Sequence, residues 1–345
     1  MSESYKKAGV DLNSAEEVTK KIAGLAKGTF TEQVMKDIGA FGGVYRFPAD
    51  SNKLLIASAD GVGTKLKIAA SLGIYNTVGQ DLVNHCINDL LTMGTRPLFF
   101  LDYIGYFDLE PEQVTRIVEG LSIACSENGV ALIGGETAQM PGIYGSGDFD
   151  LVGFILGTID EEDIVDGSSI QPGDVIIALN TNGLQTNGYS LARKVLLDSG
   201  EFSLNDKPDM LEGNSLGDAL LAIHPCFYKN IRELMDKHIA IEGMAHITGG
   251  GIPGNLVRIL PDNCRAIIDI SNIEVPPIFE LIRKTGDIPI SEMYEVFNMG
   301  AGYLVVVKCE NKDEAIEILT QSGVRAVECG KIEEGTKEVI VESAS

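Results

Sequence analysis

The chain has 345 residues, of which 50 are acidic and 27 are basic, and its formal net charge is −23. This charge argues against nucleic acid and anionic membrane surfaces as partners, because both require an excess of Lys and Arg. Phosphate can still be bound locally, through backbone N–H groups and a divalent cation. At this length we expect two domains.

The six cysteines are scattered and form no CxxC motif, which is typical of a reducing compartment. The opening residues MSESYKKAGVDL lack the apolar core of a signal peptide. No uninterrupted apolar run approaches the roughly 18 residues that a membrane span needs. We therefore expect a cytoplasmic protein.

A helix is expected to begin at Ser14 and to end near Lys27, which Gly28 follows. Its acidic residues lie near the start and its lysines near the end, as the helix dipole favours. Lys27 would complement this dipole, and the alternative is that its ammonium group reaches a bound nucleotide.

An apolar strand at residues 54–57 leads to Asp60, and the turn at 61–65, GVGTK, then leads into a helix. The glycines allow backbone N–H groups to approach anionic oxygens, Thr64 and Lys65 can donate, and Asp60 can hold a divalent cation. The spacing is not that of a Walker A loop. The pattern is typical of a phosphate-and-metal site, with a structural turn as the alternative.

Residues 79–94 are predicted to form an amphipathic helix. Its polar side carries no Lys or Glu, which favours a ligand-facing surface over the alternative of a solvated one. Two turns, roughly 12 Å, separate Asp81 from Asp89, so we expect them to serve different ions. The polar side comprises Asp81, Asn84, His85, Asn88 and Asp89.

A second acid also follows a strand. We expect a strand at 98–104, a helix at 111–128 and a buried strand at 130–133, after which come Gly134, Gly135 and Glu136. Asp60 and Glu136 beside the polar helix face form a plausible Mg²⁺ cage that bridges phosphate oxygens. Clustered carboxylates repel one another, which a bound cation would relieve.

The second half begins near Gln171 and contains two polar, glycine-bearing loops. The loop at 180–188 and the stretch HITGGG at 246–251 each lead into a helix, an arrangement that suits an anion. The alternative is that these glycines only make turns. The remaining expected elements are strands at 148–159, 175–179, 266–270 and 302–307 and near Val339, and helices at 189–197, 253–260 and 312–321.

The ordered motifs SYKKAGVDL, ASADGVGTK, GTRPLFFLDY, GGETAQMPG, NGYSLARK, HITGGG and FNMGAG resemble the phosphoribosylformylglycinamidine cyclo-ligase family, from Ser4 to about Val341. DGVGTK alone is shared with a wider ATP-using superfamily that includes selenophosphate synthetase and thiamine monophosphate kinase. The resemblance implies a mixed α/β fold with an N-terminal ATP-binding and dimerisation domain at 1–168, whose strands help build a barrel in a homodimer. It implies a C-terminal substrate-binding domain at 169–345.

The resemblance also implies an enzyme of de novo purine biosynthesis that uses ATP and Mg²⁺. Formylglycinamidine ribonucleotide would close to aminoimidazole ribonucleotide through phosphorylation of the formyl oxygen, giving ADP and phosphate. The implied metal ligands are Asp60, Asp89 and Glu136. The implied nucleotide-binding residues are Lys27, Gly61, Gly63, Thr64, Lys65 and Asp81. The implied substrate-binding residues are Gln185, Thr186, Asn187, Gly188, Thr248, Gly249, Gly250 and Gly251. The implied catalytic residues are His246, Lys27 and Asp60.

Two residues depart from the family pattern. Gln185 stands where the family commonly has His, and Gln cannot exchange protons near neutral pH, so such a role would fall to another group such as His246. Gln139 replaces an acid and leaves Glu136 as the metal candidate in its motif. The alternatives are another ATP-dependent member of the superfamily and a non-catalytic nucleotide-binding scaffold.

Overall fold

The computed structural model describes residues 31–35, 43–47 and 52–342. Lys27 and the expected N-terminal helix lie outside these residues. The described chain groups into two units. The first unit contains the residues up to Ile164 together with Tyr189–Leu204, and the second contains Val165–Gly188 and the residues from Asn205 onward.

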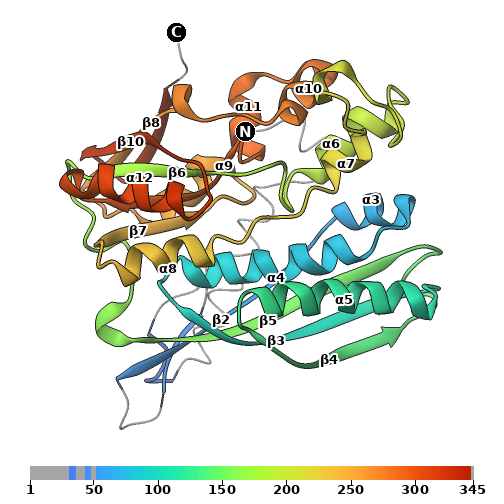
Figure 1. Cartoon of the computed structure of the whole chain (residues 1–345), viewed down its shortest axis with the longest axis horizontal. Helices are drawn as coiled ribbons and strands as arrows, with labels where there is room; N and C mark the ends of the chain where they lie inside the picture. Colours follow the sequence, from blue (N-terminus) through green and yellow to red (C-terminus); the bar gives the residue numbers. More distant parts are fainter. Residues whose placement is uncertain (1–30, 36–42, 48–51, 343–345) are drawn as a thin grey trace. The chain divides into compact units, whose positions relative to one another are not determined.

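The first unit is built on a five-stranded sheet in the order β1-β2-β5-β3-β4, in which only β3 and β4 are parallel (Figure 1). β5 lies between β2 and β3, so these two strands, which follow one another in the chain, are not neighbours in the sheet. The strands are β1 Gly43–Arg46, β2 Lys53–Gly61, β3 Arg96–Tyr106, β4 Ala131–Gln139 and β5 Phe149–Asp160.

Helices cover one face of this sheet. The helix α4 packs against β2, β3 and β5, and α5 packs beside it against β4 (Figure 1). The two helices approach closely at Gly79 and Gly120, where an added Cβ would lie 2.3 Å from the Ile117 carbonyl oxygen and 2.0 Å from the Asn76 carbonyl oxygen. The helices of this unit are α3 Lys65–Leu72, α4 Asn76–Leu91, α5 Pro111–Glu127 and α6 Tyr189–Arg193.

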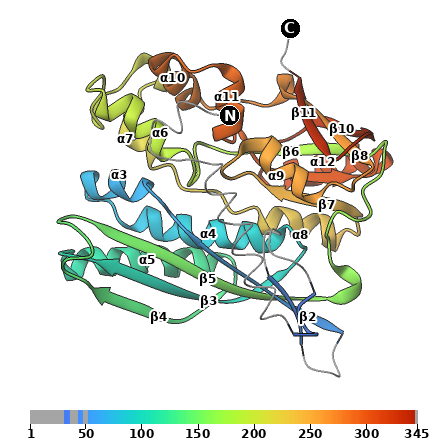
Figure 2. The same cartoon turned by 180° about the vertical axis from the view of Figure 1, so that it is seen from behind.

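The second unit contains a six-stranded sheet in the order β11-β8-β10-β6-β9-β7, with only β11 and β8 parallel (Figure 2). The strand β9, with the sequence AGYLVVV, is buried along its whole length, as a strand covered on both faces should be. The strands are β6 Val175–Asn180, β7 Ile241–His246, β8 Cys264–Asp269, β9 Ala301–Val307, β10 Ala326–Glu334 and β11 Glu338–Glu342.

Six helices of the described residues accompany this sheet. The helix α12 packs against β10 and β6 and contacts α8, and α9 contacts β7 (Figure 2). The six helices are α7 Leu216–Leu220, α8 Tyr228–Asp236, α9 Gly251–Leu256, α10 Pro277–Gly286, α11 Ile290–Val296 and α12 Lys312–Gln321.

Short helical segments of other types also occur in both units. A π-helix follows α6 at Lys194–Asp198, and 3₁₀ turns lie at Glu161–Asp163, Asp209–Leu211, Val257–Ile259, Ile270–Asn272 and Cys309–Asn311.

Most expected elements are present, and two differences matter. The strand expected at 130–133 continues to Gln139 as β4, because its parallel partner β3 keeps pairing with it across a register shift. No strand was expected at 326–334, where β10 lies between β6 and β8 and carries charged residues and a bulge near Gly330. Within the described part of the chain, no helix has the length and apolar character needed to cross a membrane.

Candidate active site

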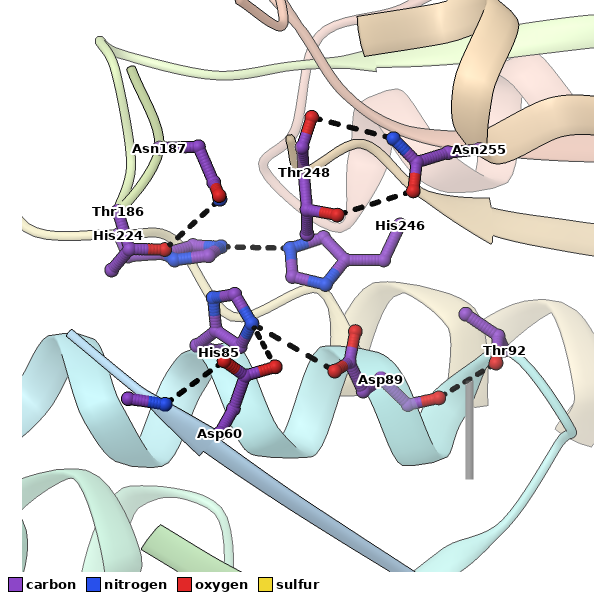
Figure 3. Close-up of polar contacts among 11 residues, drawn as sticks. Asp60, His85, Asp89, Thr92, Thr186, Asn187, His224, His246, Thr248 and Asn255 are labelled. Atoms are coloured by element: carbon purple, nitrogen blue, oxygen red, sulfur yellow. Dashed lines mark hydrogen bonds and ion pairs between the residues drawn. The ribbon is translucent and has the colours of Figure 1, made fainter. Parts of the chain in front are cut away.

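The carboxylate of Asp60 lies near the end of β2, and its Oδ1 accepts a hydrogen bond of 2.9 Å from the backbone N–H of Gly61. Its Oδ2 lies 2.9 Å from Nε2 of His85, which belongs to α4 (Figure 3). The packing of α4 on β2 therefore brings the strand-end acid to the polar side of the helix.

Asp89 follows His85 by one helical turn, so both side chains lie on one side of α4. His85 Nε2 lies 3.7 Å from Oδ2 of Asp89, and one ligand atom from each of Asp60, His85 and Asp89 lies within 4.8 Å of the others (Figure 3). The Thr92 hydroxyl donates a 2.6 Å hydrogen bond to the Asp89 backbone carbonyl and fixes the end of the helix. We call these three side chains the Asp60–His85–Asp89 cluster.

The electrostatics of this cluster depend on the pairing of opposite charges. Burial would lower the pKa of His85, but the charges of Asp60 and Asp89 outweigh it and raise this pKa to about 9. Burial would raise the pKa of Asp60, but the charge of His85 holds it well below its usual range. The proton on His85 is therefore the positive charge beside these carboxylates, and a divalent cation that binds through His85 would have to displace it.

The donor set of this cluster fits a divalent cation. Mg²⁺ in proteins commonly takes one or two carboxylates and fills its remaining positions with substrate phosphates and water. Asp60 and Asp89 supply two carboxylates from two different elements, which suits such an ion.

Lys65 and Asp81 form a separate pair in the first unit. Lys65 Nζ lies 2.7 Å from Asp81 Oδ2, both side chains are fully buried, and the ammonium lies 5.7 Å from the centre of the Tyr189 ring. Burial lowers the pKa of Lys65, and the charge of Asp81 opposes this. The Thr64 hydroxyl lies 3.2 Å from that of Ser190. The nucleotide contacts predicted for Lys65 and Asp81 stay predictions, and in this structure the two contact each other.

Glu136 does not join the Asp60–His85–Asp89 cluster. In the sheet, Asp60 is in register with Gly153, Gly153 with Asp102, and Asp102 with Gly135. Three strand spacings, about 14 Å in all, therefore separate the backbone at Asp60 from that beside Glu136. The single cage expected from Asp60 and Glu136 is not formed within this chain, because β5 and β3 lie between their strands.

The glycines of the phosphate turn have different constraints. Gly63 has φ of 69°, in the left-handed region that favours glycine, just before Thr64, the N-cap residue of α3. An added Cβ at Gly61 would lie 3.2 Å from the Leu151 carbonyl oxygen, a tight contact with the neighbouring strand. Both positions therefore favour small residues in this turn.

In the second unit, three loops meet at one end of the sheet. β6 ends at Asn180, β9 begins opposite it at Ala301, and β7 ends at His246, opposite Tyr303. The loop after β6 is tied to the turn before β9, because the backbone N–H of Thr181 donates to the Gly300 carbonyl at 2.9 Å. The side-chain amide of Asn298 donates to the Gly183 carbonyl at 3.0 Å and ties the same two segments.

The HITGGG loop lies against the loop after β6. An added Cβ at Gly249 would lie 3.4 Å from Asn187 Oδ1, so the two predicted substrate loops are neighbours (Figure 3). The side chain of Asn255 stabilises the HITGGG loop. Its amide N–H donates to the Gly251 carbonyl at 2.8 Å, and its Oδ1 accepts a 3.1 Å hydrogen bond from the Thr248 hydroxyl.

His246 is fully buried at the end of β7, and its Nε2 lies 3.0 Å from Nε2 of His224 (Figure 3). One ring donates and the other accepts, so the two rings cannot both be protonated while this hydrogen bond exists. Gln185 is buried nearby and has φ of 62°, an uncommon conformation for a residue with a side chain. The side chain of Gln185 packs against Gly302, where an added Cβ would lie only 2.5 Å from Gln185 Nε2.

Comparisons with known proteins decide the family. The model of the N-terminal domain of AIR synthase related protein matches residues 39–159, and that of the C-terminal domain matches residues 171–342. The chain belongs to the AIR synthase related family. Two relatives are named phosphoribosylformylglycinamidine cyclo-ligase. That of Myxococcus xanthus (strain DK1622) is 44% identical over 98% of both chains, and that of Thermodesulfovibrio yellowstonii (strain ATCC 51303 / DSM 11347 / YP87) is 45% identical over 99% of both.

Solved structures with the same fold include more distant proteins. The thiamine-monophosphate kinase from Stenotrophomonas maltophilia K279a has a TM-score of 0.65 at 16% identity and covers 92% of this chain and 93% of its own. AaThiL complexed with AMPPCP and TMP has a TM-score of 0.64 at 16% identity and covers 93% and 91%. These likenesses confirm the predicted mixed α/β fold, and the matched family models confirm the predicted family.

In this AIR synthase related protein, two histidines of the candidate site, His85 and His224, were not predicted as site residues. His85 was assigned to the polar side of its helix, and its spacing of four from Asp89 was the signal that could have linked the two. No sequence pattern marked the pairing of His224 with His246, because 22 residues separate them. Lys27, a predicted catalytic and nucleotide-binding residue, lies outside the described residues.

Proposed function

We propose that this chain catalyses the ATP-dependent ring closure of formylglycinamidine ribonucleotide to aminoimidazole ribonucleotide in purine biosynthesis, with ADP and phosphate as the other products. The observation that carries this proposal is the similarity to relatives named phosphoribosylformylglycinamidine cyclo-ligase. These relatives are 44% and 45% identical over nearly the whole chain, and the similarity covers both units. It favours this reaction over that of the distant kinases, whose 16% identity concerns the fold alone.

The first unit is proposed to bind the nucleotide. The related fold of AaThiL was solved with AMPPCP, which supports ATP as the ligand here. The glycines of the turn at 61–65 would offer backbone N–H groups to the phosphates, and Thr64 would add a hydroxyl donor. Asp60 and Asp89 would hold Mg²⁺, whose charge would neutralise the phosphate oxygens when it is bound. The separation of Glu136 leaves it outside this ion site.

The second unit is proposed to hold the ribonucleotide. The loops that contain Thr186, Asn187 and Gly188 and the glycines 249–251 form one end of the sheet and present backbone and amide groups to a polar ligand. We assign Gln185 to orienting an oxygen or nitrogen through hydrogen bonds, since an amide does not transfer protons. Ring closure gains from holding the amidine nitrogen and the activated carbon together.

His246 is the group proposed to move a proton. Its imidazole is a general acid–base group near neutral pH, and the hydrogen bond from or to His224 fixes which ring nitrogen carries the proton. Phosphorylation of the formyl oxygen makes that oxygen a leaving group, and the attacking nitrogen must lose a proton as the ring forms. The ATP-binding role of residues 1–168 and the substrate-binding role of residues 169–345 belong to this proposal.

A homodimer formed through the open face of the first sheet is also proposed. On this face Leu101, Tyr103, Val152 and Phe154 line a shallow hollow of about 390 Å³, and Phe154 is 47% exposed. An apolar sheet face of this kind is typical of an interface between subunits. None of the six cysteines, all of which lie in the described part of the chain, forms a disulfide bond, which supports the proposed cytoplasmic location.

The proposed function is tested with purified protein, Mg²⁺-ATP and formylglycinamidine ribonucleotide, by measuring ADP and the imidazole product together. We expect both to rise in equal amounts and only when the ribonucleotide is present. ADP at the level of the no-substrate control would overturn the proposed reaction. Phosphorylation of thiamine monophosphate would favour the kinase alternative, and tight ATP binding without turnover of either substrate would favour a scaffold.

A further inference from the structure

We propose that His85 is a metal ligand. With Asp60 and Asp89 it would form a mixed nitrogen–oxygen site that prefers a divalent first-row transition-metal ion, such as Mn²⁺, Fe²⁺ or Co²⁺, over Mg²⁺. This inference rests on the proposed function only in taking the end of β2 as the metal site. It goes beyond that function because it adds a ligand and changes the class of ion.

The distances within the cluster match those between ligands of one ion. His85 Nε2 lies 2.9 Å from Asp60 Oδ2 and 3.7 Å from Asp89 Oδ2, and the three ligand atoms lie within 4.8 Å of one another. Two ligands about 2.1 Å from a metal are about 3.0–3.4 Å apart when they meet at an octahedral or tetrahedral angle. Small side-chain rotations would therefore place all three atoms around one ion.

The backbone already holds two of these ligands in place. His85 and Asp89 are separated by one turn of α4, and this i, i+4 spacing is the one that lets two helix residues share a metal. The third ligand comes from β2, against which α4 packs. Ligands on a helix and on a paired strand are held more rigidly than ligands on loops.

The nitrogen donor determines which ion is preferred. Mg²⁺ prefers oxygen ligands, whereas imidazole is a good ligand for the transition metals. Because carboxylate oxygens also suit Mn²⁺, a preference for Mn²⁺ over Mg²⁺ does not by itself identify a nitrogen ligand, and the decisive readouts are the ¹⁴N coupling and its loss in the variant. The substitution His85→Asn would replace the imidazole nitrogen with an amide oxygen as the metal ligand and would remove the source of the preference for a transition metal.

The experiment is a titration of the wild-type protein with Mn²⁺, without nucleotide or substrate, followed by electron paramagnetic resonance. Competition with Mg²⁺ gives the relative affinity, and pulsed measurements detect the ¹⁴N coupling of a bound imidazole. We expect ¹⁴N coupling in the wild type and Mn²⁺ bound more tightly than Mg²⁺. In His85→Asn we expect the coupling to be lost and the affinity for Mn²⁺ to fall about tenfold or more, with a smaller change for Mg²⁺.

The matched control is His238→Asn, the same substitution at an exposed histidine of the second unit. Its φ of 60° is tolerated by Asn, so this change should leave both the coupling and the affinities unchanged. Mn²⁺ bound to the wild type without ¹⁴N coupling would overturn the proposal, as would equal losses of Mg²⁺ and Mn²⁺ affinity in His85→Asn. The wild-type coupling tests the proposal even if the variant fails to fold.

These outcomes are separate from those of the proposed function. The metal measurements use no ribonucleotide, so an inactive protein with a nitrogen-coordinated Mn²⁺ would retain this inference and lose the proposed reaction. An active cyclo-ligase whose Mn²⁺ has no nitrogen ligand would retain the reaction and lose this inference.

Discussion

The two proposed binding regions, one in each unit, use different physical means. In the first unit, charged groups dominate: the carboxylates of Asp60 and Asp89 face His85, and Lys65 pairs with a buried acid. In the second unit the loops are largely uncharged and are shaped by their backbone, with glycines or left-handed residues at the closest contacts. The first region is therefore suited to ions and phosphates, and the second to positioning a polar ligand by shape and hydrogen bonds.

The largest expected effect comes from breaking the buried ion pair of the first unit. Lys65→Met leaves the carboxylate of Asp81 fully buried without its cation, so we expect a loss of about 3–5 kcal/mol in the free energy of unfolding. Urea denaturation measures it. The double variant Lys65→Met/Asp81→Leu should recover much of this loss, because it removes both charges. A single variant as stable as the wild type would contradict this view of the pair.

The backbone of the second unit is tested at Gly251. This residue has φ of 60°, and an added Cβ would lie 1.9 Å from the Tyr294 carbonyl oxygen, so Gly251→Ala should destabilise the protein by about 2–4 kcal/mol. Gly254→Ala in the same helix is the control, since nothing lies within 4 Å of its added Cβ. Thermal unfolding should separate the two variants. Equal melting temperatures would show that the loop adapts without cost.

A smaller effect is expected from neutralising one carboxylate of the first unit. Asp89→Asn keeps the shape of the side chain and the backbone hydrogen bond from Thr92, but weakens the attraction for a divalent cation. At limiting Mg²⁺ we expect kcat/KM for ATP to fall about 10–100-fold, with an unchanged circular dichroism spectrum. Glu136→Gln is the matched control outside the cluster. A fall of the same size in the control would place Glu136 in the ion site after all.

The smallest effect is expected from a partly exposed ion pair of the second unit, Glu280 with Arg283, for comparison with the buried pair of the first. Hydrogen bonds from Arg283 and Lys284 lower the pKa of Glu280 from 4.5 to about 2. A lowered pKa in the folded state adds stability above the unfolded value, and this stability is lost as pH falls through about 2.

The Glu280 side chain is 40% exposed, so solvent partly screens this pair, and Glu280→Gln should lower stability at pH 7 less than Lys65→Met or Gly251→Ala. Chemical denaturation between pH 7 and pH 2 should show the difference from the wild type shrinking as the solution becomes acid. A difference that grows toward low pH would contradict the assigned direction of the pKa shift.

Local patterns in the sequence predicted much of the fold. The helix expected at 312–321 is α12, and that at 111–128 is α5 within one residue, because both have strong apolar periodicity and clear ends. The strand β10 was not predicted, since its charged residues and the bulge at Gly330 interrupt the alternation that marks a strand. Pairing with β6 and β8 stabilises it, and that pairing is not local.

The site was predicted in part. The acid at the end of β2 and the polar side of α4 followed from local sequence, and the structure brings Asp60 and Asp89 together as expected. Glu136 was expected beside them, which the sheet order prevents. Lys65 and Asp81 were expected to contact a nucleotide, and in the fold they contact each other in a fully buried pair.

By itself the sequence determined the family, the mixed α/β class and the position of many helices and strands, because these depend on motifs and on periodicity among near neighbours. Only the tertiary structure decided which side chains meet. The insertion of β5 between β2 and β3 separates Glu136 from Asp60, and the packing of α4 on β2 joins His85 to Asp60. Such contacts depend on strand order and helix packing, which bring together residues far apart in the chain.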